Sequence, residues 1–369
     1  MSPAKWSAVS RRSVIPGRGG RAALEAAFLW AGGLLSAASG CRHVDADDCQ
    51  KNRPTLGGEY ACTVPGFADR DFLLRLPAAF DGTRSLPLIV AMHGASGSKE
   101  GFNGLTCAGG DSKSPSCLSQ VADKEGFVLV YADGTRIAPA TAASRTWNAG
   151  GGGARGLRCE HACKAGVDDV AYFRALLAEI AAIVPYDRQR VYLTGFSNGA
   201  AMAHRLACEV PERIAAIAPV GGANQFAGAS PCMPSRATPI LHIHGELDPC
   251  WPYGGGLGQC VAEQTSSGPY VSVDETMVGV AGQSGSDPGW VARLGCTPTA
   301  TTTQVGRHPR DSYGGCRGGV TVSRIKVLGA GHTWPGGDQY LSSDRIGSVA
   351  PDFPASQLIV DFFKSIPAR

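Results

Sequence analysis

The chain has 369 residues, enough for one large α/β domain or two small ones, and its 43% hydrophobic and 18% charged residues are typical of a globular protein. The formal net charge of +3 comes from 34 basic and 31 acidic residues and is too small to indicate a nucleic-acid partner or strong attraction to a membrane surface. Partners therefore have to be inferred from local motifs.

The first forty residues have the order of an export signal. Arg11, Arg12 and Arg21 precede the mostly apolar stretch AALEAAFLWAGGLLSAASG, whose uncharged part is shorter than the roughly 20 residues that a membrane-spanning helix needs. We expect residues 1–40 to be a signal peptide and 41–56 a polar tether, with a secreted location. SRRSVI resembles a twin-arginine signal, and ASGC, ending at Cys41, resembles a bacterial lipoprotein cleavage box. A lipid anchor at Cys41 and simple cleavage near Ala38 both stay open.

Cysteine usage also indicates an oxidising compartment. Many of the 13 cysteines occur in close sequential pairs, which is typical of disulfides. Cys159, His161 and Cys163 have a spacing that zinc could use, but no second ligand cluster follows. A local bridge or two free thiols are the alternatives there, and we expect no metal.

Residues 57–369 alternate between strand and helix patterns. Apolar runs predict strands at 70–76, Leu88–Met92, 126–134, 189–195, 214–222, 237–245 and 320–329, and helical spacing predicts helices at 167–184, 198–211 and 354–366. This order predicts one α/β domain whose mostly parallel sheet is covered by helices on both faces. The Gly/Ser/Thr/Pro-rich stretches 251–288 and 296–319 are long for plain connections and are expected to be insertions near the site.

A candidate nucleophile lies between an expected strand and an expected helix. Gly195-Phe196-Ser197-Asn198-Gly199 fits G-x-S-x-G, in which a sharp strand-to-helix turn presents the serine. In a chain with 50 glycines this pattern alone also arises by chance. Its partners therefore decide whether Ser197 is catalytic.

A nucleophilic serine needs a histidine as base and a carboxylate that orients it, in the chain order Ser, acid, His for this type of turn. Asp248 follows the expected strand PILHIHG, and His332 follows the expected strand that ends near Leu328. Both lie beyond the carboxyl ends of strands, where sites in open α/β sheets form. Five other residues could in principle serve as the acid or the base. Glu246 is interpreted as an exposed turn residue, His308 as a loop residue, and His204, His242 and His244 as buried packing or supporting groups.

The oxyanion of an acyl-transfer intermediate needs two N–H donors. The backbone of Asn198, directly after the serine, is the first candidate. The loop MHGASGS supplies the second through the Ala95 N–H, since Gly94 lets the chain turn, and Ser96 is the alternative donor. His93 is expected to be structural.

Several motifs in collinear order resemble one family. PLIVAMHGASGS, TWNAGG, RVYLTGFSNGAAMAHRL, LHIHGELDP and GAGHTWPGG are similar to the secreted polyhydroxybutyrate depolymerases and feruloyl esterases, which are α/β hydrolases. The resemblance implies a serine carboxylesterase with Ser197, Asp248 and His332 as its triad and without metal or organic cofactor. It implies ester substrates, either 3-hydroxybutyrate oligomers or polyester, or feruloyl and acetyl esters of carbohydrates.

The resemblance also implies secondary features of the site. Trp147 and Trp334 would flank it and offer flat surfaces to a feruloyl ring or a sugar, with plain packing as the alternative, and Ser96 would contact substrate. The stretch 251–288 would cap or narrow the pocket. The implied disulfides are Cys107–Cys117, Cys208–Cys232, Cys250–Cys260 and Cys296–Cys316. We hypothesise that the Cys250–Cys260 bridge positions Asp248.

Two other functions stay open at this point. One is a surface lipoprotein or binding protein that uses a hydrolase-like fold without catalysis, against which the three ordered polar residues argue. The other is a serine peptidase or acyltransferase on the same fold, which the triad alone does not exclude.

Overall fold

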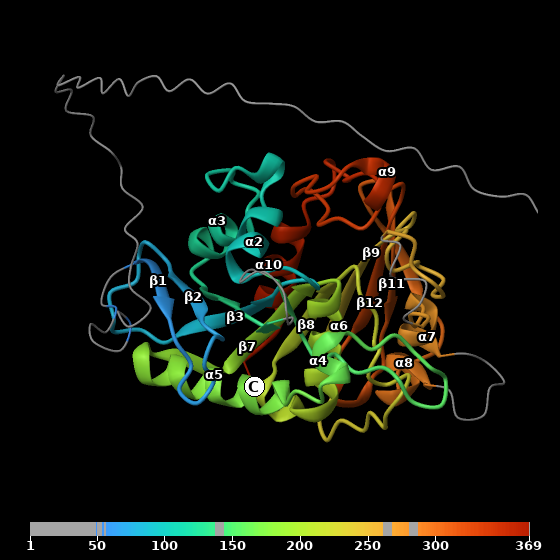
Figure 1. Ribbon diagram of the computed structural model, residues 1–369, viewed down its shortest axis with the longest axis horizontal. Coiled ribbons are helices and arrows are strands. Elements are labelled where there is room, and N and C mark those ends of the chain that lie inside the picture. Colours follow the sequence, from blue (N-terminus) through green and yellow to red (C-terminus); the bar gives the residue numbers. More distant parts are fainter. Residues whose placement is uncertain are drawn as a thin grey trace, which may run out of the picture. The chain divides into compact units, whose positions relative to one another are not determined.

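A ten-stranded sheet runs through the chain (Figure 1). The computed structural model describes residues 57–136, 144–260, 268–279 and 287–368, together with Cys49 and Pro54. The sheet strands are β1 (Gly58–Cys62), β2 (Phe72–Leu76), β3 (Leu86–Met92), β4 (Val128–Ala132), β7 (Tyr186–Phe196), β8 (Ala216–Val220), β9 (Ile240–Gly245), β10 (Thr301–Val305), β11 (His308–Tyr313) and β12 (Val322–Val327). A separate two-stranded ribbon pairs β5 (Thr135–Arg136) with β6 (Arg145–Thr146).

The sheet is parallel in its centre and antiparallel at both edges. Its strand order is β1-β2-β4-β3-β7-β8-β9-β12-β11-β10, and the run from β4 to β12 pairs in parallel. Parallel strands have to be joined by crossovers, which place helices over the faces of the sheet. The carboxyl ends of β3, β7, β8, β9 and β12 consequently meet along one edge.

Helices cover both faces of this sheet. The helices are α2 (Lys99–Leu105), α3 (Leu118–Lys124), α4 (His161–Lys164), α5 (Asp169–Ile183), α6 (Asn198–Glu209), α7 (Val273–Val278), α8 (Gly289–Arg293), α9 (Ser343–Ile346) and α10 (Ala355–Ser365). Short 3-10 turns lie at Ala108–Gly110, Pro211–Arg213 and Arg317–Gly319. Figure 1 shows α2, α3 and α10 on one side of the sheet and α5 and α6 on the other.

The side chains of β3 show how both faces are buried. Leu88, Val90 and Met92 pack into one hydrophobic cluster with α5 and α6, whereas Ile89 and Ala91 pack into a second cluster with α2, α3 and α10. Successive residues of a strand point to opposite faces, so a strand covered on both sides must be apolar throughout. The predicted fold class, one α/β domain with a mostly parallel, doubly covered sheet, is confirmed.

Helix α5 illustrates why the helical boundaries follow from the sequence. The Asp168 side chain accepts a hydrogen bond from the Ala171 N–H at 2.9 Å and so caps the first turn. Phe173, Leu176 and Ile180 are buried on one face, and Pro185 follows the last turn.

The stretch 296–319 differs from its prediction as a loop insertion. It contains β10 and β11, which extend the sheet as an antiparallel hairpin beyond β12. His308 accordingly begins a strand rather than lying in a polar loop. The side chains of β10 are mostly exposed, so this edge strand lacks the apolar pattern that marks a buried strand.

No helix in the described ranges is both long enough and apolar enough to cross a bilayer. The predictions of a signal peptide at 1–40 and of a processed or lipidated Cys41 lie outside the described residues. Within the expected tether, Cys49 is described and forms a disulfide with Cys62 at the end of β1.

Candidate active site

Ser197 occupies a strained turn between β7 and α6. Its φ of 55° and ψ of −117° lie outside the regions that non-glycine residues prefer. Glycine is required on both sides of Ser197 because neighbouring backbone atoms occupy the space that a Cβ would need. A Cβ at Gly199 would collide with the carbonyl oxygens of Met92 and His93, and one at Gly195 would lie 2.5 Å from the Gly199 oxygen. The turn therefore packs directly against the end of β3.

Asp248 and His332 form a buried hydrogen-bonded pair. His332 Nδ1 lies 2.7 Å from Asp248 Oδ2, although 84 residues separate them in sequence. Asp248 follows β9 and His332 follows β12, two neighbouring parallel strands. The pairing thus results from the register of the sheet.

Asp248 is held as a carboxylate by its surroundings. Its Oδ1 accepts the N–H groups of Cys250 and Trp251, both at 2.8 Å, and His244 Nε2 lies 3.4 Å from Oδ2. Burial raises the pKa of Asp248, but the charge of His332 and the hydrogen bonds from His244 and His332 outweigh burial and lower the pKa to about 2. The side chain is therefore ionised and fixed in orientation at neutral pH.

The His332 loop is anchored at several points. The His332 N–H donates to the Ile346 carbonyl at 2.5 Å, and the Tyr340 hydroxyl donates to the His332 carbonyl at 3.2 Å. The His332 ring also packs on Phe196, with ring centroids 4.7 Å apart. Because Phe196 directly precedes Ser197, this contact ties the imidazole to the turn that carries the serine.

Ser197 and His332 line the same cavity, whose volume is about 600 Å³. Within the described part of the chain, no hydrogen bond joins the Ser197 hydroxyl to the imidazole of His332. Catalytic hydrogen bonds are often long without substrate and tighten on binding. The large apolar side chains of the lining are Phe102, Leu105, Phe196 and Leu341, and the other polar side chains are His93, Ser96, Asp338 and Tyr340.

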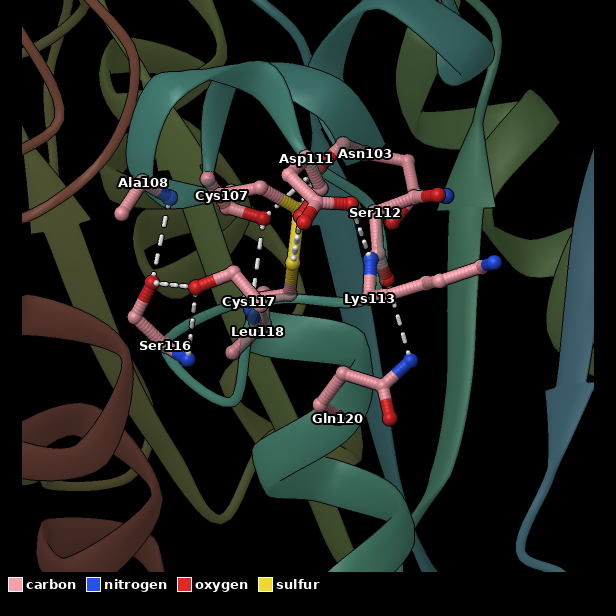
Figure 2. Close-up of a disulfide and its surroundings, with 12 residues drawn as sticks. Asn103, Cys107, Ala108, Asp111, Ser112, Lys113, Ser116, Cys117, Leu118 and Gln120 are labelled. Atoms are coloured by element: carbon pink, nitrogen blue, oxygen red, sulfur yellow. Dashed lines mark hydrogen bonds between the residues drawn. A yellow bond between two sulfur atoms is a disulfide. The ribbon is translucent and has the colours of Figure 1, made fainter.

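One wall of the cavity is stiffened by a disulfide (Figure 2). The loop between α2 and α3 contains Gly110, which lines the cavity, and is closed by Cys107–Cys117. Within this loop Ser116 Oγ accepts the Ala108 N–H at 3.1 Å, as Figure 2 shows. The disulfide therefore restrains the part of the wall that follows α2.

Two backbone N–H groups near Ser197 remain available to a ligand. Asn198 begins α6, where the first N–H groups have no partner within the helix. In the loop after β3, the Ser96 N–H donates to the Arg145 carbonyl at 2.7 Å, whereas the hydrogen bonds of the described chain give the Ala95 N–H no acceptor. Ala95 is thus the better placed donor of the two, and Ser96 keeps only its side chain for a ligand.

A buried ionic network that sequence reasoning missed holds this loop. Asp133, 1% exposed, accepts the Lys99 N–H at 2.8 Å and contacts Lys99 Nζ at 2.9 Å and Arg145 Nε at 3.2 Å. Burial lowers the pKa of Lys99, but the Asp133 carboxylate more than compensates and raises it. Asp133 is the first residue after the apolar strand β4, so a carboxylate directly after an apolar strand was the signal available in the sequence.

The side chain of Asn198 was also missed. Its Oδ1 accepts the Trp147 N–H at 2.7 Å, and its Nδ2 donates to the Trp147 carbonyl at 3.1 Å. Asn198 thereby fastens the segment after β6 to the first turn of α6.

Both tryptophans that were expected to contact substrate are buried instead, and this prediction is wrong. Trp147 is 2% exposed and donates its Nε1–H to the His93 carbonyl, while Trp334 is fully buried and donates to Ser356 Oγ. Neither ring lines the cavity. Each pairs its indole N–H inside the protein, which is how buried tryptophans satisfy that group.

The described residues of the stretch 251–288 do not line the cavity either. Trp251 stacks on Tyr270 with ring centroids 4.2 Å apart, and Asn224 donates its N–H to Thr276 Oγ1. This segment packs against the loop after β8, so the expectation that it caps the pocket is not met in its described part.

The structure contains all four disulfides that the resemblance implied, together with Cys49–Cys62 and Cys159–Cys163. The Cys159–Cys163 bridge removes the thiols that a zinc site there would need. A second group, Asp248, Cys250 and His332, brings its ligand atoms within 4.8 Å. Cys250 is bonded to Cys260 and the other two bond to each other, so we assign no metal to this group.

Comparisons with known proteins agree with this geometry. A family model described as phospholipase/carboxylesterase matches residues 170–267, which include Ser197 and Asp248. Feruloyl esterase B of Piromyces equi is 26% identical over 265 residues, 71% of this chain but only 42% of that protein. The putative esterase NocK of Nocardia uniformis subsp. tsuyamanensis is 29% identical over 283 residues, 75% of this chain and 73% of that protein.

Among solved structures, the acetyl xylan esterase from Aspergillus awamori superposes with a TM-score of 0.49 at 15% identity and covers 75% of this chain and 94% of its own. The chain is thus similar in sequence to proteins named as esterases, and its mostly parallel sheet with helices on both faces is that of an α/β protein.

Proposed function

We propose that the protein is a serine carboxylesterase in which Ser197 is the nucleophile, His332 the general base and Asp248 the residue that orients the base. The observation that carries this proposal is the 2.7 Å hydrogen bond between His332 and the ionised Asp248 beside a strained serine on the same cavity. This arrangement makes the histidine a base for the serine in acyl transfer, whereas binding alone does not require it.

The reaction follows from the protonation states. Asp248 accepts the Nδ1–H of His332, which leaves Nε2 free to take the proton of the Ser197 hydroxyl as its oxygen attacks an ester carbonyl. The N–H groups of Ala95 and Asn198 stabilise the oxyanion of the tetrahedral intermediate. His332 then protonates the departing alkoxide, which leaves an acyl-enzyme. Water, deprotonated by His332, attacks this ester, and release of the acid restores Ser197.

The lining of the cavity supports an ester with a flat or short acyl group. Phe102, Leu105 and Leu341 provide apolar contact, and Asp338 offers a carboxylate to a substrate hydroxyl. The relatives are named as feruloyl and acetylxylan esterases, which supports feruloyl or acetyl esters of carbohydrates as substrates. 3-Hydroxybutyrate esters are the alternative, and side-by-side rates on the three ester types distinguish them.

The cysteines support export to an oxidising compartment. Six disulfides use twelve of the thirteen cysteines, and such bridges persist outside the cytosol. The remaining cysteine of the sequence is Cys41, where we propose a lipid anchor. Metabolic labelling with palmitate in the parent and in Cys41→Ser tests the anchor, because label in both or in neither would contradict it.

The experiment that tests the enzyme proposal is hydrolysis of p-nitrophenyl acetate and butyrate. Ser197→Ala should lower kcat on the order of 10⁶-fold, as loss of a serine nucleophile does, while the far-UV spectrum stays unchanged. Ser85→Ala is the matched control, since Ser85 is exposed before the start of β3, far from the cavity. Equal rates in Ser197→Ala and the control would contradict the proposal and leave a binding protein as the alternative.

A further inference from the structure

Three buried histidines connect α8 to the Asp248 loop. His204 lies on α6, His242 and His244 lie on β9, and all three side chains are fully buried. His204 Nε2 lies 3.3 Å from His242 Nδ1, and His242 Nε2 lies 3.2 Å from His244 Nδ1. None of these rings lines the cavity, and only His244 contacts Asp248.

The groups at the two ends of this chain of rings fix the direction in which its hydrogen bonds are donated. At one end Trp290 Nε1 lies 3.0 Å from His204 Nδ1, and an indole nitrogen can only donate. At the other end His244 Nε2 lies 2.8 Å from the Trp251 carbonyl and 3.4 Å from Asp248 Oδ2, and these oxygens can only accept. Every ring nitrogen between them has a partner, so no nitrogen is left to bind a metal.

Only one distribution of protons satisfies all of these contacts. His204 Nδ1 must accept from Trp290, so its proton is on Nε2 and is donated to His242 Nδ1. The same step repeats from His242 to His244, and His244 then donates its Nε2–H toward Trp251 and Asp248. Each imidazole is neutral, because a charged ring would place two N–H groups against each other at one of the links.

The surroundings of His204 and His242 favour the neutral form of both rings. Burial, together with the charge of Arg293, lowers the pKa of His204 to about 3. Burial also lowers the pKa of His242 well below its ordinary value, with His244, His204 and Arg324 acting in the same direction. Arg293 itself is paired with Asp287, and Arg324 with Asp274 and Asp311.

We propose that Trp290, His204, His242 and His244 form a one-directional hydrogen-bonded relay that fixes the tautomer of His244 and thereby positions the carboxylate of Asp248. The residues are positioning residues, and their role in the reaction rests on the proposed function. If His244 adopted the other tautomer, an Nε2 lone pair would face both the Trp251 carbonyl and the Asp248 carboxylate. The repulsion would move the turn that presents Asp248 to His332.

The first test measures the ring nitrogens of the native chain by ¹⁵N NMR of labelled histidines. We expect His204, His242 and His244 to carry a proton on Nε2 and none on Nδ1 at neutral pH. A proton on Nδ1 of any of the three would overturn the relay. This readout needs no activity, so it stands apart from a failure of the enzyme proposal.

The second test compares two variants of His242 whose new side chains have similar length. His242→Gln keeps an N–H that can donate to His244 and an oxygen that can accept from His204, whereas His242→Met keeps only the volume. We expect His242→Met to lower kcat about tenfold with unchanged KM, the lower end of what loss of a partner behind a functional ligand costs, and to change the His244 tautomer. His242→Gln should keep kcat near the parent value and leave the His244 tautomer unchanged.

Equal losses of kcat in the two variants would show that the ring matters only for packing and would overturn the positioning role. Unchanged kcat in His242→Met would do the same. If neither variant folds, the tautomers of the parent chain decide. If the Ser197 hydroxyl proves unreactive while the three tautomers are as expected, the enzyme proposal fails and the relay itself remains.

Discussion

His332 Nδ1 lies 2.7 Å from Asp248 Oδ2, and Asp248 accepts two further backbone N–H groups through its other oxygen. The acid is therefore held from the loop after β9 while it holds the imidazole of the loop after β12. Most predictions about this site concern what keeps these two atoms in place.

Replacing the acid by its amide should give the wrong histidine tautomer. In Asp248→Asn the amide can donate to Nδ1, which moves the imidazole proton to Nε2 and blocks removal of the serine proton. We expect kcat to fall roughly 10⁴-fold, as the equivalent change does in serine proteases. Rates on p-nitrophenyl butyrate check this, with Glu246→Gln as the control because Glu246 is exposed two residues earlier. Parent-like rates in Asp248→Asn would show that Asp248 is not the acid that orients His332.

The same carboxylate should make stability depend on acidity. Its pKa in the folded chain is about 2, below the ordinary 3.8, so its stabilising effect is complete above about pH 4 and is lost as pH falls through 2. The shift corresponds to roughly 2 kcal/mol of unfolding free energy. Denaturant unfolding of the parent and Asp248→Asn over this range measures it. The difference between them should shrink with acidification, and a constant or growing difference would contradict the ionised pair.

The bridge behind the acid should matter for both stability and activity. Cys250–Cys260 closes a loop of ten residues, and loss of such a constraint costs about 3 kcal/mol. The Cys250 N–H also donates to Asp248, so the paired change Cys250→Ser and Cys260→Ser should lower kcat as well as Tm. The paired change Cys159→Ser and Cys163→Ser is the control, expected to lower Tm alone. Activity that survives loss of the first bridge would show that it does not position Asp248.

The buried network around Asp133 should be essential to the position of the loop after β3. Asp133→Asn removes the buried carboxylate that Lys99 and Arg145 share, although Lys99 keeps its contact with Glu100, and breaking a buried ion pair typically costs about 3–5 kcal/mol. Since Arg145 holds the Ser96 N–H, we also expect a lower kcat at temperatures where the variant is folded. Chemical denaturation and esterase rates measure the two effects. Asp81→Asn, an exposed acid, serves as the control, and similar stability in both variants would refute the role of Asp133.

The central strands could be predicted because burial on both faces leaves an unambiguous apolar pattern. Leu88–Met92 and the strand before Ser197 are examples, and the rule that sites form at the carboxyl ends of such strands directed attention to Asp248 and His332. The glycines around Ser197 are equally local signals, because they follow from backbone collisions within one turn and the neighbouring strand end.

What could not be predicted depends on contacts far apart in sequence. The burial of Trp147 and Trp334 depends on partners such as the His93 carbonyl and Ser356, which only the folded chain brings to the indole N–H groups. The polar strand β10 pairs at the edge of the sheet, where exposure removes the apolar signal. The histidines of β9 were interpreted as packing groups, and their alignment with Trp290 appears only once α8 is in place.

The most direct measurement is labelling of the native chain with a fluorophosphonate, followed by mass spectrometry of the modified peptide. The activated hydroxyl at Ser197 should take up one equivalent of probe, and labelling should fall to background in His332→Ala, with the far-UV spectrum of the variant as the check of its fold. Labelling of another residue, or equal labelling of Ser197 with and without His332, would contradict a serine activated by that histidine.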